Sequence, residues 1–161
     1  MLLVIPIFIP HRGCPHDCLF CNQQKISGYA RNETARVAVA ETVEEWLGRK
    51  KDRSQVQVAF FGGSFTCLPA VEQVELLSAV QPYIKDEKVD TIRLSTRPDC
   101  IDPAVCALLK EYRVGVVELG AQSLNDRVLQ KSLRGHSSEQ VRNAFRLLRD
   151  SGMQVGLQLM P

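Results

Sequence analysis

The chain has 161 residues, of which 45% are hydrophobic and 24% charged, and its formal net charge at pH 7 is +2. These are ordinary values for a single globular domain, so they exclude a disordered chain and a fibrous repeat. A charge so close to zero also gives no electrostatic signal for binding nucleic acid or an anionic membrane.

Residues 1–10 are apolar and predict a buried strand. They have neither the basic start nor the small-residue cleavage site of a signal peptide, and they are far fewer than the ~20 residues that span a bilayer. We therefore expect a cytoplasmic protein whose six cysteines are thiols and not disulfides. Three of them, Cys67, Cys100 and Cys106, are scattered along the chain and have no predicted role.

Hydrophobic periodicity predicts alternating helices and strands in the rest of the chain. The predicted helices cover 34–47, 69–84, the segment after the N-cap Asp102, 125–133 and the segment from Ser137 or Ser138 to Ser151; the predicted strands cover 55–61, 90–95, 114–119 and 153–160. Two of the helices should bury apolar stripes, formed by Val71, Val74, Leu77, Val80 and Ile84 and by Val141, Ala144, Phe145 and Leu148.

Strand and helix alternate with a unit of roughly 30 residues, which calls for a parallel sheet with right-handed crossovers. The sequence therefore predicts an α/β fold in one domain. The segments that directly follow the strands are polar or contain glycine. Because the carboxyl ends of parallel strands are where such folds bind ligands, these segments should converge on one site.

The first of these segments contains three cysteines within eight residues, Cys14, Cys18 and Cys21. Thiolates are soft ligands that select zinc, copper(I) or an iron–sulfur cluster. A structural zinc site takes four ligands, and no second cysteine pair of matching spacing is present, although His11 or His16 would complete such a site. A four-iron cluster normally takes four cysteines, so three would leave one iron open to another ligand.

The spacing Cys-x3-Cys-x-aromatic-Cys, with Phe20 as the aromatic residue, resembles the signature loop of the radical S-adenosylmethionine (radical SAM) superfamily. The resemblance implies a partial parallel (β/α) barrel over residues 1–161, with five of the usual six strands and an incomplete carboxyl-terminal end. It also implies a 4Fe-4S cluster on the three cysteines and S-adenosylmethionine on the open iron. One electron, from a donor such as a flavodoxin or ferredoxin, would then cleave S-adenosylmethionine and release a 5′-deoxyadenosyl radical.

The resemblance extends to the other segments that follow strands. Gly62, Gly63 and Ser64 are similar to the Gly-Gly-Glu motif that receives the amino group of S-adenosylmethionine, with Ser64 in place of the acid. Further cofactor contacts are expected from Ser95, Thr96, Arg97 and Gln122. An alternative for Arg97 is a scaffold role, paired with Asp99 or with Glu118. A buried Glu118 needs a partner, and Arg97 is the predicted one.

Segments 61–65, 96–99, 117–123, 134–136 and 159–161 resemble the subgroup that contains the catalytic subunit of Elongator. That similarity implies tRNA uridine modification, and a porphyrinogen-oxidase-like role on a small molecule is the alternative. The segment 134–136 is expected to be a surface turn. Two rival hypotheses are an inactive, truncated radical SAM fragment and a structural zinc-binding module.

Overall fold

The computed structural model describes residues 2–9, 14–21, 35–49 and 55–160. His11, the start of the predicted first helix at position 34 and the ends of the first predicted strand lie outside these residues. The strands are β1 (Leu2–Phe8), β2 (Gln55–Phe61), β3 (Thr91–Thr96), β4 (Val114–Gln122) and β5 (Gln154–Leu159). The helices are α2 (Ala35–Leu47), α3 (Ala70–Lys85), α4 (Pro103–Glu111), α5 (Asp126–Lys131) and α6 (Ser138–Asp150), with short 3-10 helices η1 (Phe65–Cys67) and η2 (Pro98–Cys100).

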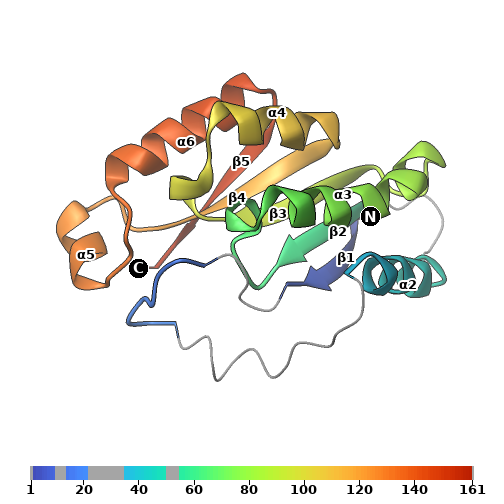
Figure 1. Ribbon diagram of the computed structural model, residues 1–161, viewed down its shortest axis with the longest axis horizontal. Coiled ribbons are helices and arrows are strands. Elements are labelled where there is room, and N and C mark those ends of the chain that lie inside the picture. The colour runs from blue at the N-terminus through green and yellow to red at the C-terminus, as the bar shows by residue number, and fades with distance from the viewer. Residues whose placement is uncertain (1, 10–13, 22–34, 50–54, 161) are drawn as a thin grey trace.

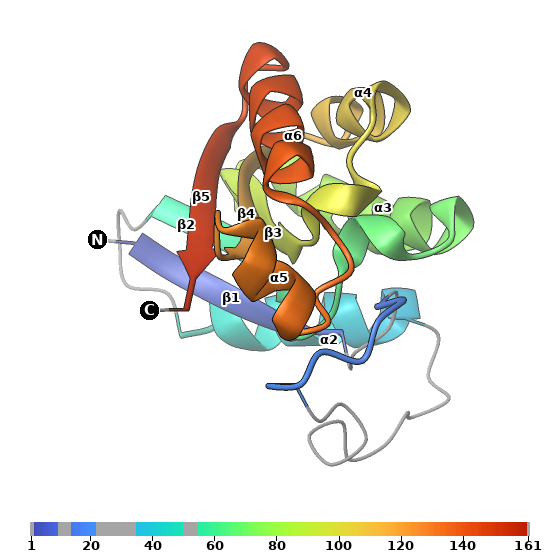
Figure 2. The same ribbon diagram turned by 90° about the vertical axis from the view of Figure 1, so that its left-hand side faces the viewer.

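The five strands form one sheet in the order β1-β2-β3-β4-β5, and every neighbouring pair is parallel. Because each crossover advances the sheet in the same direction and such crossovers are right-handed, the helices gather on one face, as Figures 1 and 2 show. This is the winding of a (β/α) barrel. In the described part of the chain β1 and β5 do not pair, so the barrel is partial.

The core lies between the sheet and this layer of helices. Alternate strand residues such as Val58, Phe60, Ile92 and Leu94 are almost fully buried there, as the two-residue period of a strand requires. On the helix side the buried residues include Val43 of α2, Leu77 and Val80 of α3, Leu109 of α4, and Val141 and Leu148 of α6.

The opposite, concave face of the sheet carries polar side chains. Arg93 forms an ion pair with Glu118, and Ser95 donates a hydrogen bond of 3.1 Å to the same carboxylate. The predicted pairing of Glu118 with Arg97 is therefore wrong: Arg93 alternates with the buried Ile92 and so points to the same face as Glu118. Desolvation raises the pKa of Glu118, but the bonds from Arg93, Ser95 and Gln158 outweigh it and hold that pKa below its usual value.

The predicted elements are all present, with shifts of a few residues at their ends. Asp102 caps α4 by accepting a hydrogen bond of 2.7 Å from the Val105 amide, and Ser137 and Gln140 form a capping box at α6. Pro69 is the N-cap of α3 and not its first residue. β4 continues to Gln122, whereas the predicted strand ended at residue 119. Residues 120–122 therefore belong to the strand and not to the segment that follows it.

The predicted inward stripes are wrong at three positions. Val71 is 79% exposed, and Val74 and Phe145 are each 36% exposed. In α3 the inward place near the amino end is taken by Gln73, whose amide donates to the carbonyls of Thr66 and Leu68 at 3.1 and 2.7 Å. A polar side chain faces inward there because η1 offers it backbone acceptors.

Candidate functional site

The loops that follow β2 and β3 are joined by buried hydroxyl groups. The Thr96 hydroxyl lies 2.6 Å from that of Thr66 and 3.1 Å from that of Ser64. Ser64 Oγ also accepts a hydrogen bond of 3.1 Å from the Arg97 amide. In this structure the hydroxyls of Ser64 and Thr96, both predicted cofactor contacts, therefore bind each other and the adjoining backbone.

Gly62 is positioned by both its conformation and a close contact. Its φ is +88°, a region that favours glycine, and a Cβ atom there would lie 2.1 Å from the ring of Phe8. The Phe8 ring thus covers Gly62 on the side where a Cβ would point. Gly63, the second predicted glycine, follows directly and is half-buried.

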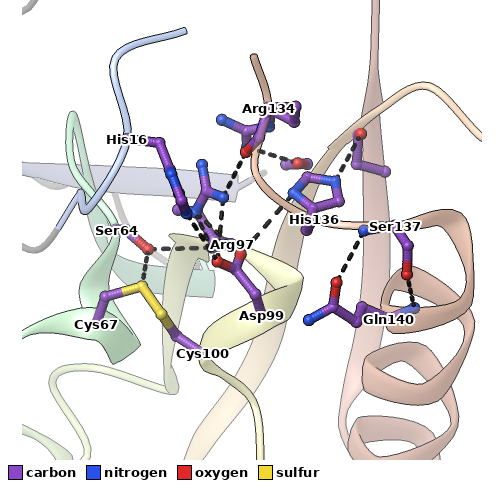
Figure 3. Close-up of polar contacts among 12 residues, drawn as sticks. His16, Ser64, Cys67, Arg97, Asp99, Cys100, Arg134, His136, Ser137 and Gln140 are labelled. Carbon is purple, nitrogen blue, oxygen red and sulfur yellow. Dashed lines mark hydrogen bonds and ion pairs between the residues drawn. A yellow bond between two sulfur atoms is a disulfide. The ribbon is translucent and has the colours of Figure 1, made fainter. Parts of the chain in front are cut away.

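A disulfide joins Cys67 of η1 to Cys100 of η2, with a Cα–Cα distance of 5.3 Å. The prediction that all six cysteines are thiols is therefore wrong for this pair. The two residues are 33 positions apart, but parallel pairing of β2 with β3 places the loops after the two strands side by side. Ser64 Oγ lies 2.8 Å from Cys67 Sγ, as Figure 3 shows. The disulfide therefore borders the hydroxyl cluster formed by Ser64, Thr66 and Thr96.

Arg97 is 2% exposed and forms an ion pair with Asp99. Its Nε and Nη2 atoms donate to the Asp99 carboxylate at 2.9 and 3.1 Å, and Nη2 also donates to the Arg134 carbonyl at 2.6 Å. The geometry is that of the scaffold alternative, in which Arg97 pairs with Asp99. Its Nη1 atom has no hydrogen-bond partner among the described residues.

Arg134 and His136 are each 7% exposed, so the prediction that segment 134–136 is a surface turn is wrong for these two side chains, although Gly135 between them is exposed. Arg134 Nη2 donates to the Gly120 carbonyl at 2.7 Å, and His136 Nε2 lies 3.2 Å from the Ala121 carbonyl. Both carbonyls belong to the end of β4, where the sheet register shifts and leaves backbone acceptors free for side chains. No local pattern in the sequence signals such tertiary acceptors, which is why these two residues were missed.

His136 stays neutral in this environment. Desolvation by burial, together with the charges of Arg134 and Arg97, lowers its pKa to about 4. The Asp99 carboxylate, 3.8 Å from His136 Nδ1, opposes this shift but lies beyond hydrogen-bonding distance. Since Nε2 faces a carbonyl, the proton of the neutral ring belongs on Nε2.

Gln122 has a φ of +65°, which is uncommon for a residue other than glycine. Its side chain returns toward Gly120: a Cβ atom on Gly120 would lie 3.3 Å from Gln122 Nε2 and 2.8 Å from Arg134 Nη2. The missing side chain of Gly120 therefore lets two nitrogen donors approach the backbone at the end of β4 closely. Backbone strain of this kind gathers at functional sites.

The cysteine loop lies beside the connection between α5 and α6 (Figures 1 and 2). Cys18 is buried and accepts a hydrogen bond of 3.4 Å from Arg134 Nη1, whereas Cys14 and Cys21 are half-buried. None of the three is part of a disulfide in the described structure, and Phe20 is 41% exposed.

Three cysteine thiols outside any disulfide, in one short loop, match the donor chemistry of an iron–sulfur cluster. Within the described ranges, however, no three His, Cys, Asp or Glu side chains are gathered as a set of metal ligands. The loop thus has the right donors without a preformed metal cage, as is usual where metal binding and local folding are coupled.

A surface hollow lies elsewhere, between the end of α3 and Arg113. It adjoins the amino ends of the strands and includes none of the predicted site residues. Ligands of parallel α/β folds bind at the opposite edge, so we assign this hollow no role.

The sequence matches the family model of the radical SAM superfamily over residues 8–161. The chain belongs to the radical SAM superfamily. This radical SAM chain is 28% identical to the tRNA uridine(34) acetyltransferase of Methanocaldococcus infernus, over an alignment that covers 98% of this chain and 36% of that protein.

Solved structures share the fold of this radical SAM chain. The archaeal Methanocaldococcus infernus Elp3 with an N-terminal deletion superposes with a TM-score of 0.70 at 20% identity, covering 99% of this chain and 38% of that one. Native anSMEcpe with bound AdoMet and Cp18Cys peptide gives a TM-score of 0.68 at 18% identity, covering 98% and 42%. The predicted partial barrel is confirmed, and the chain spans less than half the length of these proteins.

None of the helices in the described part of the chain is both long enough and apolar enough to cross a membrane.

Proposed function

We propose that this radical SAM chain binds a 4Fe-4S cluster through Cys14, Cys18 and Cys21 and cleaves S-adenosylmethionine reductively. One observation carries the proposal: in a chain of this superfamily, the loop with three cysteine thiols outside any disulfide lies at the carboxyl end of the parallel sheet. There it contacts Arg134, which is anchored on the end of β4. When bound, the cluster and S-adenosylmethionine supply the electron transfer and bond cleavage that give a 5′-deoxyadenosyl radical.

The chain contributes ligands, orientation and exclusion of water. The thiolates hold the cluster, and burial of Cys18 keeps solvent from its sulfur. Two buried N–H groups, on Arg97 Nη1 and Arg134 Nε, have no partner among the described residues. Because a guanidinium binds a carboxylate strongly, these groups suit the carboxylate of S-adenosylmethionine.

The remaining cofactor contacts are proposed at positions around this pair of arginines. Gln122 places its amide beside Gly120, at the end of β4. Gly63 and Ser95 lie at the ends of β2 and β3, and Phe20 lies within the cysteine loop. Gly62, Ser64 and Thr96 complete the set predicted from the sequence.

For the substrate we take tRNA as the first class to test, because a relative matched over 98% of this chain is named a tRNA uridine(34) acetyltransferase. The second solved neighbour was instead determined with a peptide, so the fold alone does not select the substrate. A flavodoxin or ferredoxin is the proposed class of electron donor.

The test is anaerobic reconstitution with iron and sulfide, followed by metal and acid-labile sulfide analysis and a measurement of 5′-deoxyadenosine after reduction. We expect iron, sulfide and 5′-deoxyadenosine in the wild type and their loss in Cys14→Ala, Cys18→Ala and Cys21→Ala. Cys106→Ala is the matched control, because Cys106 is also a free thiol and is buried in the core away from the loop. Zinc without sulfide would establish the structural zinc module, and a cluster without 5′-deoxyadenosine would establish the inactive fragment.

A further inference from the structure

The cysteine loop is held against residues 132–135, the connection between α5 and α6, at three points. The Leu19 amide donates a hydrogen bond of 3.2 Å to the Ser132 carbonyl. Arg134 Nη1 donates to Cys18 Sγ at 3.4 Å. The imidazole of His16 packs against the backbone of Gly135. All three contacts fall within four consecutive residues, which therefore form a docking platform for the loop.

Gly135 leaves the space that the His16 ring occupies. A Cβ atom at position 135 would lie 2.4 Å from His16 Nε2 and 2.5 Å from two carbon atoms of the ring. Real Cβ atoms do not approach heavy atoms so closely, so any side chain at this position would displace the ring. Gly135 also has a φ of +76°, which glycine adopts without strain.

Asp99 faces the same ring. Its Oδ2 atom lies 3.8 Å from His16 Nε2, an ion-pair distance, while the Asp99 side chain is only 12% exposed. Arg97 fixes this carboxylate and donates through Nη2 to the Arg134 carbonyl at 2.6 Å. Figure 3 shows His16, Arg97 and His136 around Asp99, with Arg134 linked to Arg97 through its carbonyl group. One buried guanidinium thus holds both the carboxylate and the platform in place.

We propose that His16 is a positioning residue that docks the cysteine loop into a socket formed by Gly135 and Asp99. His16 lies two residues from Cys14 and two residues from Cys18, so the position of its backbone fixes both thiols. Docking follows from these contacts alone. Its consequence, that the docked loop assembles and retains the cluster, rests on the proposed function.

The Leu19 amide reports docking without any cofactor, because its hydrogen-bond acceptor belongs to the platform. Its hydrogen exchange is measured by NMR in the full, metal-free chain. We expect Gly135→Ala to speed this exchange roughly tenfold or more, because the added methyl group expels His16 and opens the loop.

The matched control is Gly152→Ala. Gly152 has a φ of +88°, so alanine carries a similar backbone penalty, but nothing lies within 4 Å of the position of its Cβ atom. Leu19 exchange should stay within about twofold of the wild type in this variant. Urea unfolding of both variants measures the global cost, which should be similar. Equal Leu19 exchange in the two alanine variants would overturn the socket.

A double-mutant cycle gives a second test. His16→Ala alone should speed Leu19 exchange, and adding Gly135→Ala to it should have little further effect, since the clashing ring is gone. Additive effects of the two substitutions would show that Gly135 acts independently of His16, and the inference would fail.

The consequence for the cluster has its own readout. After reconstitution and desalting, Gly135→Ala and His16→Ala should retain less iron and sulfide per chain, and give a weaker electron paramagnetic resonance signal after reduction, than Gly152→Ala and the wild type. Equal retention in all four proteins would contradict the role of docking in cluster retention. A wild type without sulfide would overturn the proposed function, while Leu19 exchange would still decide whether the socket exists.

Discussion

The protonation state of His136 is set by its burial and by the charged residues around it. Its side chain is fully buried, and its neutral ring is linked to the end of β4 through the Ala121 carbonyl. Protonation would place a third positive charge beside Arg97 and Arg134, and among the described residues Asp99 is the one carboxylate that favours the charged ring. The ring therefore acts as a neutral structural link in the site.

A pH dependence of stability follows from this residue. Its pKa is about 4 in the folded chain and about 6.5 in the unfolded chain, so between these values the unfolded state binds more protons and stability rises with pH. Lowering the pH from 7.5 to 5 should cost about 2 kcal/mol through this group alone. Urea unfolding of the wild type and of His136→Gln at both pH values measures the difference. An equal loss in the two proteins would contradict the assigned neutral state.

At the scale of elements, the turns after β2 and β3 are joined by the hydroxyl cluster and by the Cys67–Cys100 disulfide. Closing a loop with a separation of 33 residues stabilises a protein by about 3–4 kcal/mol on the chain-entropy model. We expect the oxidised protein to exceed the reduced protein in free energy of unfolding by an amount of this order.

Thiol titration checks the disulfide directly. The denatured, metal-free chain purified without reductant should show four titratable thiols, those of Cys14, Cys18, Cys21 and Cys106, and six after reduction. The double variant Cys67→Ser/Cys100→Ser should show four under both conditions. Six thiols in the unreduced wild type would restore the expectation drawn from the sequence.

The sequence predicted the elements and their order because apolar periodicity and turn residues act locally. It predicted α4 and α6 well, since Asp102 and Ser137 cap their own helices. It predicted the inward side of α3 correctly at Leu77, Val80 and Ile84, but not near the amino end of the helix. Which side faces inward there depends on acceptors in η1 that bind Gln73, so a nonlocal contact outweighed the hydrophobic pattern at Val71.

In the candidate site, too, features that depend on local sequence patterns were predicted, and features that depend on contacts between distant segments were not. The cysteine spacing and the turns after the strands are local patterns, and they indicated the family and the edge of the sheet. The burial of Arg134 and His136 depends on carbonyl groups at the end of β4, and the disulfide depends on two turns meeting in space. Neither has a signature in the linear order of residues.

At the scale of the whole molecule, the open sheet exposes β5. Leu157 and Leu159 are 40% and 55% exposed, and β5 pairs only with β4 among the described strands. An unpaired apolar strand edge promotes association with other chains.

We expect sedimentation to show concentration-dependent association that Leu159→Lys reduces. Val71→Lys is the control, since Val71 is 79% exposed on α3, away from that edge. Equal reduction by both substitutions would show that added charge, and not the edge, is responsible.

The proposed activity requires that the three thiols hold a cluster with one corner open to S-adenosylmethionine. The most direct measurement is the electron paramagnetic resonance spectrum of the reconstituted, reduced protein before and after S-adenosylmethionine is added. We predict the signal of a reduced 4Fe-4S cluster whose g-values shift on addition, because the cofactor binds the open iron. A cluster signal that S-adenosylmethionine leaves unchanged, or no cluster signal at all, would contradict the account.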